Sequence, residues 1–97
     1  MKVIYADEAL RGLDKILEFI ELNYPTISAA FGTRLRGIEQ RIGRWPKSAA
    51  EVEQRPGVHV VPLIRYPYKL FYRIAVDVIE VLHIQHAARR EPWEGER

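Results

Sequence analysis

The stretch that decides the fold is residues 58–86, VHVVPLIRYPYKLFYRIAVDVIEVLHIQH. It contains three runs rich in β-branched and aromatic residues, at 58–65, 69–75 and 78–86. Short turns around Tyr66-Pro67-Tyr68 and Val76-Asp77 separate these runs, and this pattern predicts a three-strand antiparallel meander. Pro62 interrupts the first run, so we expect it at a sheet edge or a bulge, because proline cannot donate a ladder hydrogen bond.

The N-terminal half has apolar residues at three- and four-residue steps, which is typical of amphipathic helices. After a short strand at 2–5, Asp7 is the expected N-cap of a first helix that ends near Asn23-Tyr24, before Pro25. The apolar stripe expected on this helix is Leu10, Leu13, Leu17, Ile20 and Tyr24, with Ile16 beside it.

A second helix is expected to begin after Thr26 or after Ser28, since either side chain can cap it, and to close at Trp45-Pro46. Its apolar stripe is Ile27, Phe31, Leu35, Ile38 and Ile42. Two helices with so short a connection form an antiparallel hairpin. The predicted class is therefore α+β: a short N-terminal strand, a helical hairpin and a three-strand antiparallel meander packed on the helices.

The size and composition of the chain limit the classes of protein it can be. With 97 residues it is one small domain, 1–97, in which 87–97 form a polar C-terminal tail. It has no cysteine, which excludes disulfides, thiolate metal sites and cysteine nucleophiles. No apolar run reaches the ~20 residues of a membrane helix, and no signal-peptide pattern is present, so we expect a cytoplasmic protein without a membrane partner.

The net charge of +2 is unevenly distributed. Residues 1–24 hold three basic and five acidic residues, whereas 34–44 hold four basic and one acidic, and 55–90 hold six basic and two acidic. Eleven of the fifteen basic residues are arginine, the side chain best suited to forked binding of phosphate and carboxylate. The second half therefore favours a polyanion or an acidic peptide as a partner.

Two segments resemble the RelE/ParE toxin superfamily of type II toxin–antitoxin systems. They are 65–74, RYPYKLFYRI, and 79–89, IEVLHIQHAAR. The resemblance implies a growth-inhibiting toxin, of the kind that takes part in plasmid stabilization, held inactive by an antitoxin from an adjacent gene, with no cofactor. The pattern His86-Ala87-Ala88-Arg89 is closer to the ParE branch, whose members inhibit DNA gyrase by direct binding. The alternatives are a RelE-like ribosome-dependent mRNA endonuclease (an mRNA interferase) and a non-toxic relative that only binds its antitoxin.

The endonuclease alternative would use Lys69, Arg73, His86 and Arg89, which supply cations and one acid–base group. Ordinary roles compete with it: His86 as a hydrogen-bonded histidine at a strand end, and Lys69 and Arg73 as solvated cations. The chain lacks the tail aromatic or histidine-tyrosine ending that the resemblance implies for many nuclease members. Trp93 occupies roughly that region; it cannot transfer a proton at neutral pH, but its ring can stack on a base. Whether the chain is an enzyme stays open, with a non-enzymatic role favoured.

Candidate binding residues divide into two sets. For the cellular target they are Arg89, Arg90 and Trp93, although Glu91, Glu94 and Glu96 are near enough to pair with these arginines. For the antitoxin they are Phe19, Arg34, Arg41 and Arg44; the arginines alternatively clamp carboxylates of the first helix, such as Asp14 or Glu21. We expect no metal site, because His83 and His86 fall on opposite faces of one strand and His59 lies on another.

Overall fold

The computed structural model describes residues 1–93 and has an α+β architecture, which confirms the predicted class. The elements in chain order are β1 (Lys2–Tyr5), α1 (Asp7–Asn23), the 3₁₀ turn η1 (Pro25–Ile27), α2 (Ser28–Arg44), β2 (Ala50–Glu51), β3 (Val58–Pro62), β4 (Tyr68–Ile74) and β5 (Val78–His86). Within the described part of the chain, no helix is long and apolar enough to cross a bilayer.

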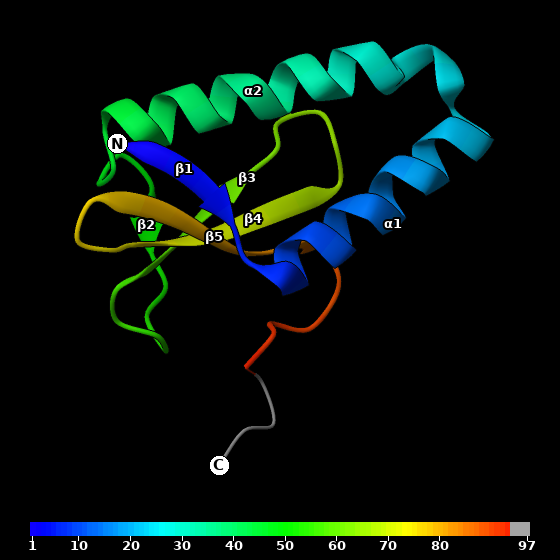
Figure 1. Cartoon of the computed structure of the whole chain (residues 1–97). Helices are drawn as coiled ribbons and strands as arrows, with labels where there is room; N and C mark the ends of the chain where they lie inside the picture. The colour runs from blue at the N-terminus through cyan, green and yellow to red at the C-terminus, as the bar shows by residue number, and fades with distance from the viewer. Residues whose placement is uncertain (94–97) are drawn as a thin grey trace.

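One five-stranded sheet, in the order β1-β5-β4-β3-β2, contains the predicted meander. β3, β4 and β5 are antiparallel neighbours, while β1 pairs in parallel with β5, Lys2 opposite Val78 (Figure 1). The two-residue strand β2 was not predicted, because its sequence is polar and too short to show a period. It pairs only with His59 and Val60, so Pro62 lies at the free edge of β3, as expected.

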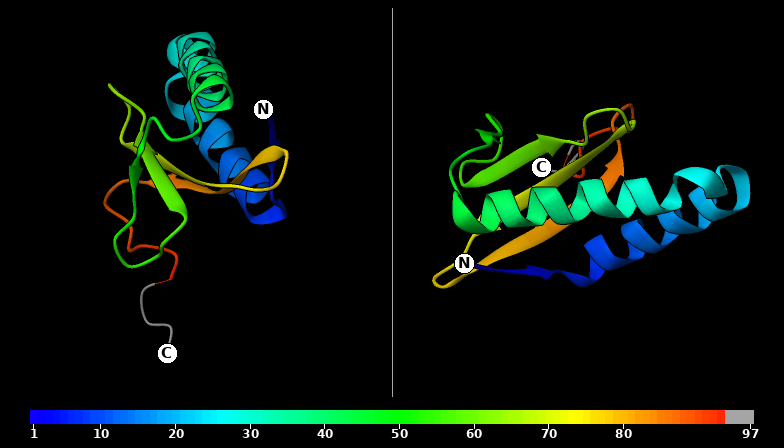
Figure 2. Two further views of the ribbon diagram at one scale, coloured as in Figure 1. Left: turned by 90° about the vertical axis from the view of Figure 1, so that its left-hand side faces the viewer. Right: turned by 90° about the horizontal axis from the view of Figure 1, so that it is seen from above.

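The two faces of the sheet have different covers. α1 and α2 lie over one face, here called the helix face, and the chain after β5 crosses the other, here called the tail face (Figure 2). Leu70 and Tyr72 of β4 point into the apolar core under the helices and are fully buried. Phe71, between them in sequence, is also fully buried but lies on the tail face, because side chains alternate along a strand. Both faces are therefore covered at the middle of β4.

α1 differs from the predicted helix in two respects. Asp7 is its first residue rather than its N-cap, because the backbone of Ala6 still pairs with β5 through an N–H bond to the Val81 carbonyl at 2.9 Å. The buried face also runs through Ala9, Ile16 and Ile20, whereas Leu10 and Tyr24 are exposed, so including these two in the stripe was wrong.

The buried face of α1 differs from the predicted stripe because α1 approaches β5 closely. A Cβ on Gly12 would stand 2.5 Å from the Ile84 carbonyl oxygen, so only glycine fits there without a shift of backbone. This contact turns the side of α1 that holds Ala9, Gly12 and Ile16 toward β5 and leaves Leu10 outside. Tyr24 follows the last turn of α1, which extends beyond the sheet in Figure 2.

α2 begins at Ser28 after η1, and neither Thr26 nor Ser28 caps it; Ile27 stands at the N-cap without a side-chain hydrogen bond. The expected cap is therefore wrong: a 3₁₀ turn, closed by the Ile27 N–H on the Tyr24 carbonyl at 3.0 Å, links the helices instead. The predicted stripe from Phe31 to Ile42 is buried. α1 and α2 diverge from this link, and among residues 1–93 no ion pair joins an α2 arginine to α1.

Candidate functional site

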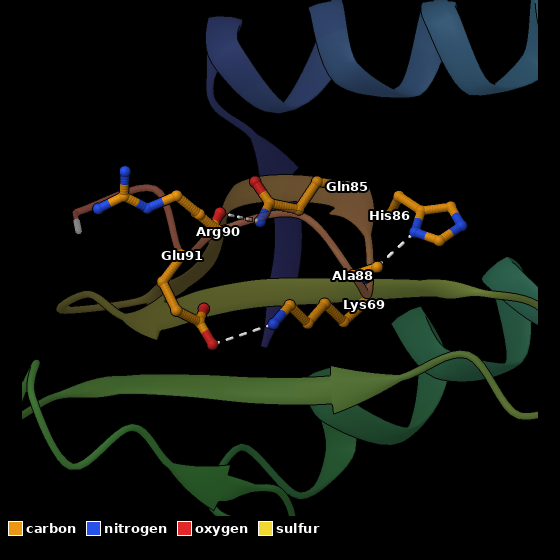
Figure 3. Close-up of polar contacts among 6 residues, drawn as sticks. All are labelled: Lys69, Gln85, His86, Ala88, Arg90 and Glu91. Carbon is orange, nitrogen blue, oxygen red and sulfur yellow. Dashed lines mark hydrogen bonds and ion pairs between the residues drawn. The ribbon is translucent and has the colours of Figure 1, made fainter. Parts of the chain in front are cut away.

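Residues 87–93, here called the tail, leave β5 through a turn built around His86. The Ala87 N–H donates to the Pro67 carbonyl at 2.7 Å, and the Arg89 N–H donates to the His86 carbonyl at 3.0 Å. The Nδ1 atom of His86 accepts the Ala88 N–H at 3.1 Å (Figure 3). Since Nδ1 is an acceptor, a neutral His86 carries its proton on Nε2. The ring of this predicted acid–base candidate therefore also orders the start of the tail.

The tail then lies over Lys69 of β4. The Lys69 Nζ donates to Glu91 Oε1 at 3.0 Å, and the Gln85 Nε2 donates to the Arg90 carbonyl at 2.8 Å. The side chain of Lys69 is only 17% exposed, so little of it remains in contact with solvent. Figure 3 shows both contacts, with the Arg90 guanidinium directed away from Lys69.

Trp93 is the apolar contact that holds the far end of the described tail. Its ring meets Phe71 edge to face, with the ring centroids 5.1 Å apart, and the Arg55 guanidinium carbon lies 5.8 Å from the Trp93 centroid. Aromatic pairs of this geometry stabilise by about 0.5–1.5 kcal/mol beyond their buried area. This target-binding candidate is thus half-buried against the sheet.

The four residues predicted for a nuclease are not gathered around one cavity. Arg73, near the other end of β4, pairs across the strands with Glu80, Nε to Oε1 at 2.6 Å. Lys69 and His86 make the contacts described above. Of the four, only Arg89 lines the groove described next. The strand period predicts Lys69 and Arg73 on one face, but it gives no sign of the acidic partner that each side chain has.

A polar groove of about 440 Å³ runs between the first half of α1 and the tail, and we call it the α1–tail groove. Its lining residues are Glu8, Arg11, Gly12, Lys15, His83, Ile84, Gln85, Arg89, Arg90, Glu91 and Pro92. Burial lowers the pKa of His83; the nearby Glu8 carboxylate opposes the shift and Arg89 adds to it. Burial therefore favours the neutral form of the ring. The sequence points to Arg89 and Arg90 by residue type and position, but not to Arg11 and Lys15, which lie in an acidic segment.

A second groove, of about 420 Å³, lies between α2 and the loop that joins β3 to β4, and we call it the α2–loop groove. Arg34, Arg41 and Arg65 line it together with Tyr66. Arg65 has a φ of 79°, in the left-handed region that non-glycine residues rarely adopt. In the sequence Arg65 is part of the family motif, and its place before Tyr66-Pro67 marks the turn.

An apolar groove adjoins it on the other side of Arg65 and Tyr66, with Phe19, Tyr24 and Ile27 on the helical side. Phe19 is 51% exposed, as expected from its place off the apolar stripe. The structure thus brings three of the four antitoxin candidates to adjoining grooves. Arg44 lies apart, with its guanidinium carbon 4.8 Å from the Trp45 ring centroid. Within residues 1–93, no group of three histidine, aspartate or glutamate side chains is placed to hold a metal ion.

Comparison with known proteins gives one family and one fold. The family model described as the ParE toxin of the type II toxin–antitoxin system parDE matches residues 3–91. A search of curated protein sequences returned no match.

Three solved structures illustrate the shared fold, each 19% identical to this chain. The chromosomal ParDE system from P. aeruginosa aligns with a TM-score of 0.74 over 89% of this chain and 95% of that one. The isolated E. coli RelE toxin aligns with a TM-score of 0.59 over 93% and 87%, and the intact E. coli RelBE toxin–antitoxin complex with 0.60 over 91% and 98%.

Proposed function

Because the chain belongs to the ParE toxin family of type II toxin–antitoxin systems, we propose that it is the toxin of such a pair and inhibits DNA gyrase by binding it directly. The observation that carries the proposal is that the basic side chains Lys69 and Arg73 are already paired with carboxylates. Lys69 and Arg73, the cations that a nuclease would turn toward RNA, each hold a carboxylate, and the tail lies over Lys69. A surface arranged in this way supports binding rather than cleavage.

Proton-transfer geometry supports the same choice. Cleavage by a 2′-hydroxyl needs a base near the nucleophile, an acid near the leaving oxygen and cations around the phosphorane. His86 has only Nε2 left for such work, because Nδ1 accepts the Ala88 N–H. Arg89, exposed in the α1–tail groove, remains available to contact a target protein.

The test is a pair of assays on the same purified toxin. We expect it to inhibit supercoiling of relaxed plasmid by gyrase and to leave mRNA intact on translating ribosomes. Cleavage of mRNA within ribosome-bound codons, with supercoiling unchanged, would establish the endonuclease alternative. In that event Lys69→Ala should abolish cleavage, and Lys47→Ala, an exposed lysine outside the tail face, is the matched control. Normal growth of cells that express the chain alone would instead establish a non-toxic relative.

We also propose that the antitoxin binds across the α2–loop groove and the adjoining apolar groove. Arg34, Arg41 and Arg65 offer three cations on one side of the β3–β4 loop, and Phe19 and Tyr24 offer exposed rings on the other. The surface fits an amphipathic segment with acidic residues on one face and apolar residues on the next, a recognised mode of peptide capture.

Charge reversal tests this assignment. The probe is the product of the gene adjacent to the toxin gene, co-expressed and captured through a tag on the toxin. We expect Arg34→Glu with Arg41→Glu to release it. Arg36→Glu is the control. Arg36 lies on the same helix but does not line the groove, and its guanidinium donates to the Thr33 hydroxyl. Equal loss of capture in the control, or none in the double variant, would place the antitoxin elsewhere.

A further inference from the structure

The charges of α1 are segregated around the helix. Its two basic residues, Arg11 and Lys15, both line the α1–tail groove, whereas Asp14, Glu18 and Glu21 do not. Glu8 is the one acidic residue of α1 in the groove, and its carboxylate already accepts the Arg11 guanidinium at 2.5 Å. A helix that is acidic as a whole thus presents its cations to the groove.

The opposite wall adds further positive charge. Arg89 and Arg90 belong to it, while the carboxylate of Glu91, also in the lining, holds the Lys69 ammonium. Across the part of the chain that the structure describes, neither Lys15 nor Arg89 has an acidic side chain within ion-pair distance. Two elements far apart in sequence therefore place cations on both sides of one groove.

We propose that the α1–tail groove binds the phosphodiester backbone of double-stranded DNA. Arginine and lysine facing each other across a polar groove suit a row of phosphates, which position a protein on a duplex without reading its sequence. Among the described lining residues the only ring is the imidazole of His83, and no Phe, Tyr or Trp is present, so the groove lacks the row of large rings on which single-strand binders stack bases. The inference stands apart from the antitoxin grooves and does not depend on the gyrase proposal.

A peptide is a poorer fit. Only Gly12, Ile84 and Pro92 among the lining residues are uncharged and apolar, which leaves little surface for the side chains of an amphipathic segment. The groove beside Phe19 and Tyr24 has the opposite character, with rings and aliphatic groups on both walls. The two grooves are therefore suited to ligands of different chemistry.

The test is fluorescence anisotropy with a labelled 20-base-pair duplex, titrated with the whole toxin at several salt concentrations. Two to four phosphates neutralised in the groove predict that log K falls with log[salt] with a slope of about −2 to −4. Lys15→Gln and Arg89→Gln should each weaken binding and reduce that slope by about 1. Arg36→Gln removes the same charge outside the groove and should leave the slope unchanged.

Several results would overturn the proposal. These are the absence of binding at 50 mM salt, an effect of Arg36→Gln equal to that of the groove variants, and tighter binding to the corresponding single strand. Competition by polyglutamate as effective, charge for charge, as competition by unlabelled duplex would assign the groove to acidic peptides instead. Lys15 and Arg89 are exposed, so their variants should keep the native circular dichroism spectrum. A negative result here leaves the supercoiling assay to decide the gyrase proposal.

Discussion

The helix face of the sheet lies under two helices of 17 residues each, whereas the tail crosses the tail face as a single irregular segment. Under the helices the contacts are aliphatic and aromatic and form one continuous core. Under the tail they are separate: an ion pair at Lys69, a ring contact at Phe71 and an amide hydrogen bond at Gln85. Continuous burial stabilises the whole fold, while isolated contacts order a segment that can be altered without unfolding the rest.

The largest effect should come from the core of the helix face. Phe31 is fully buried and meets Tyr66 and Tyr68 edge to face, with centroids 5.3 and 5.9 Å away. Phe31→Ala should lower the free energy of unfolding by about 3–5 kcal/mol, measured by urea denaturation. Phe19→Ala, which truncates a half-exposed ring on α1, is the control and should cost far less. Similar losses in the two variants would contradict the assignment of the core.

A smaller loss is expected where α1 touches the edge of β5. Gly12→Ala places a Cβ against the Ile84 carbonyl and should destabilise by about 1–3 kcal/mol, because backbone must move. Gly37→Ala, in the middle of α2 with nothing near its added Cβ, should stabilise by about 0.5–1 kcal/mol. Urea midpoints measure both; if they shift in the same direction, the close approach of α1 to β5 is wrong.

On the tail face, Trp93→Ala should remove the ring contact, worth about 0.5–1.5 kcal/mol, together with the contribution of the area that the half-buried ring covers, and the effect should be local. Hydrogen exchange is the measurement: amides of 87–93 should exchange faster while those of β4 and β5 keep their protection. Glu91→Gln should have a similar local effect, since it removes the carboxylate that holds Lys69. A decrease in the free energy of unfolding as large as that of Phe31→Ala would show instead that the contacts of the tail face stabilise the whole fold.

The smallest effect is a pH dependence at the edge of the α1–tail groove. Burial lowers the pKa of His83 in the folded chain, while the unfolded ring titrates near its ordinary 6.5. Unfolded chains therefore bind more protons as the pH falls from 7.5 to 5.5, and stability decreases over that range. Thermal melts should show this decrease, and His83→Gln should reduce it. An unchanged pH dependence in His83→Gln would exclude burial of this ring as its source.

The elements of the fold were predictable from residue spacing, because a period of two or of 3.6 is a local property. Strand β4 and the stripe of α2 from Phe31 to Ile42 illustrate this. The rotation of α1 was not predictable, since it depends on Gly12 meeting a carbonyl 72 positions later. The parallel addition of β1 beside β5 also depends on contacts that no local pattern contains.

The candidate sites show the same division. Arg89, Arg90 and the α2 arginines stood out by residue type and position, and the structure places most of them in grooves. Lys15 did not stand out, because its segment carries net negative charge. Only the path of the tail shows which side of α1 lines a groove. The carboxylate partners of Lys69 and Arg73 could not be predicted for the same reason, since Glu91 lies 22 positions beyond Lys69 in sequence.

The pairing of β1 with β5 also constrains how the chain folds during its synthesis. β1 cannot join the sheet until its partners in β5 have been synthesised: Val78 is the partner of Lys2, and Val81 is the partner of Tyr5. At a translation rate of 5–20 residues per second, those intervening residues take roughly 4–15 s to be made. Until then α1 lacks β5, the strand on which it packs, and its apolar face is exposed to other proteins. Such long-range closure slows folding, so a newly made toxin is expected to remain open to capture or aggregation for seconds before the sheet is complete.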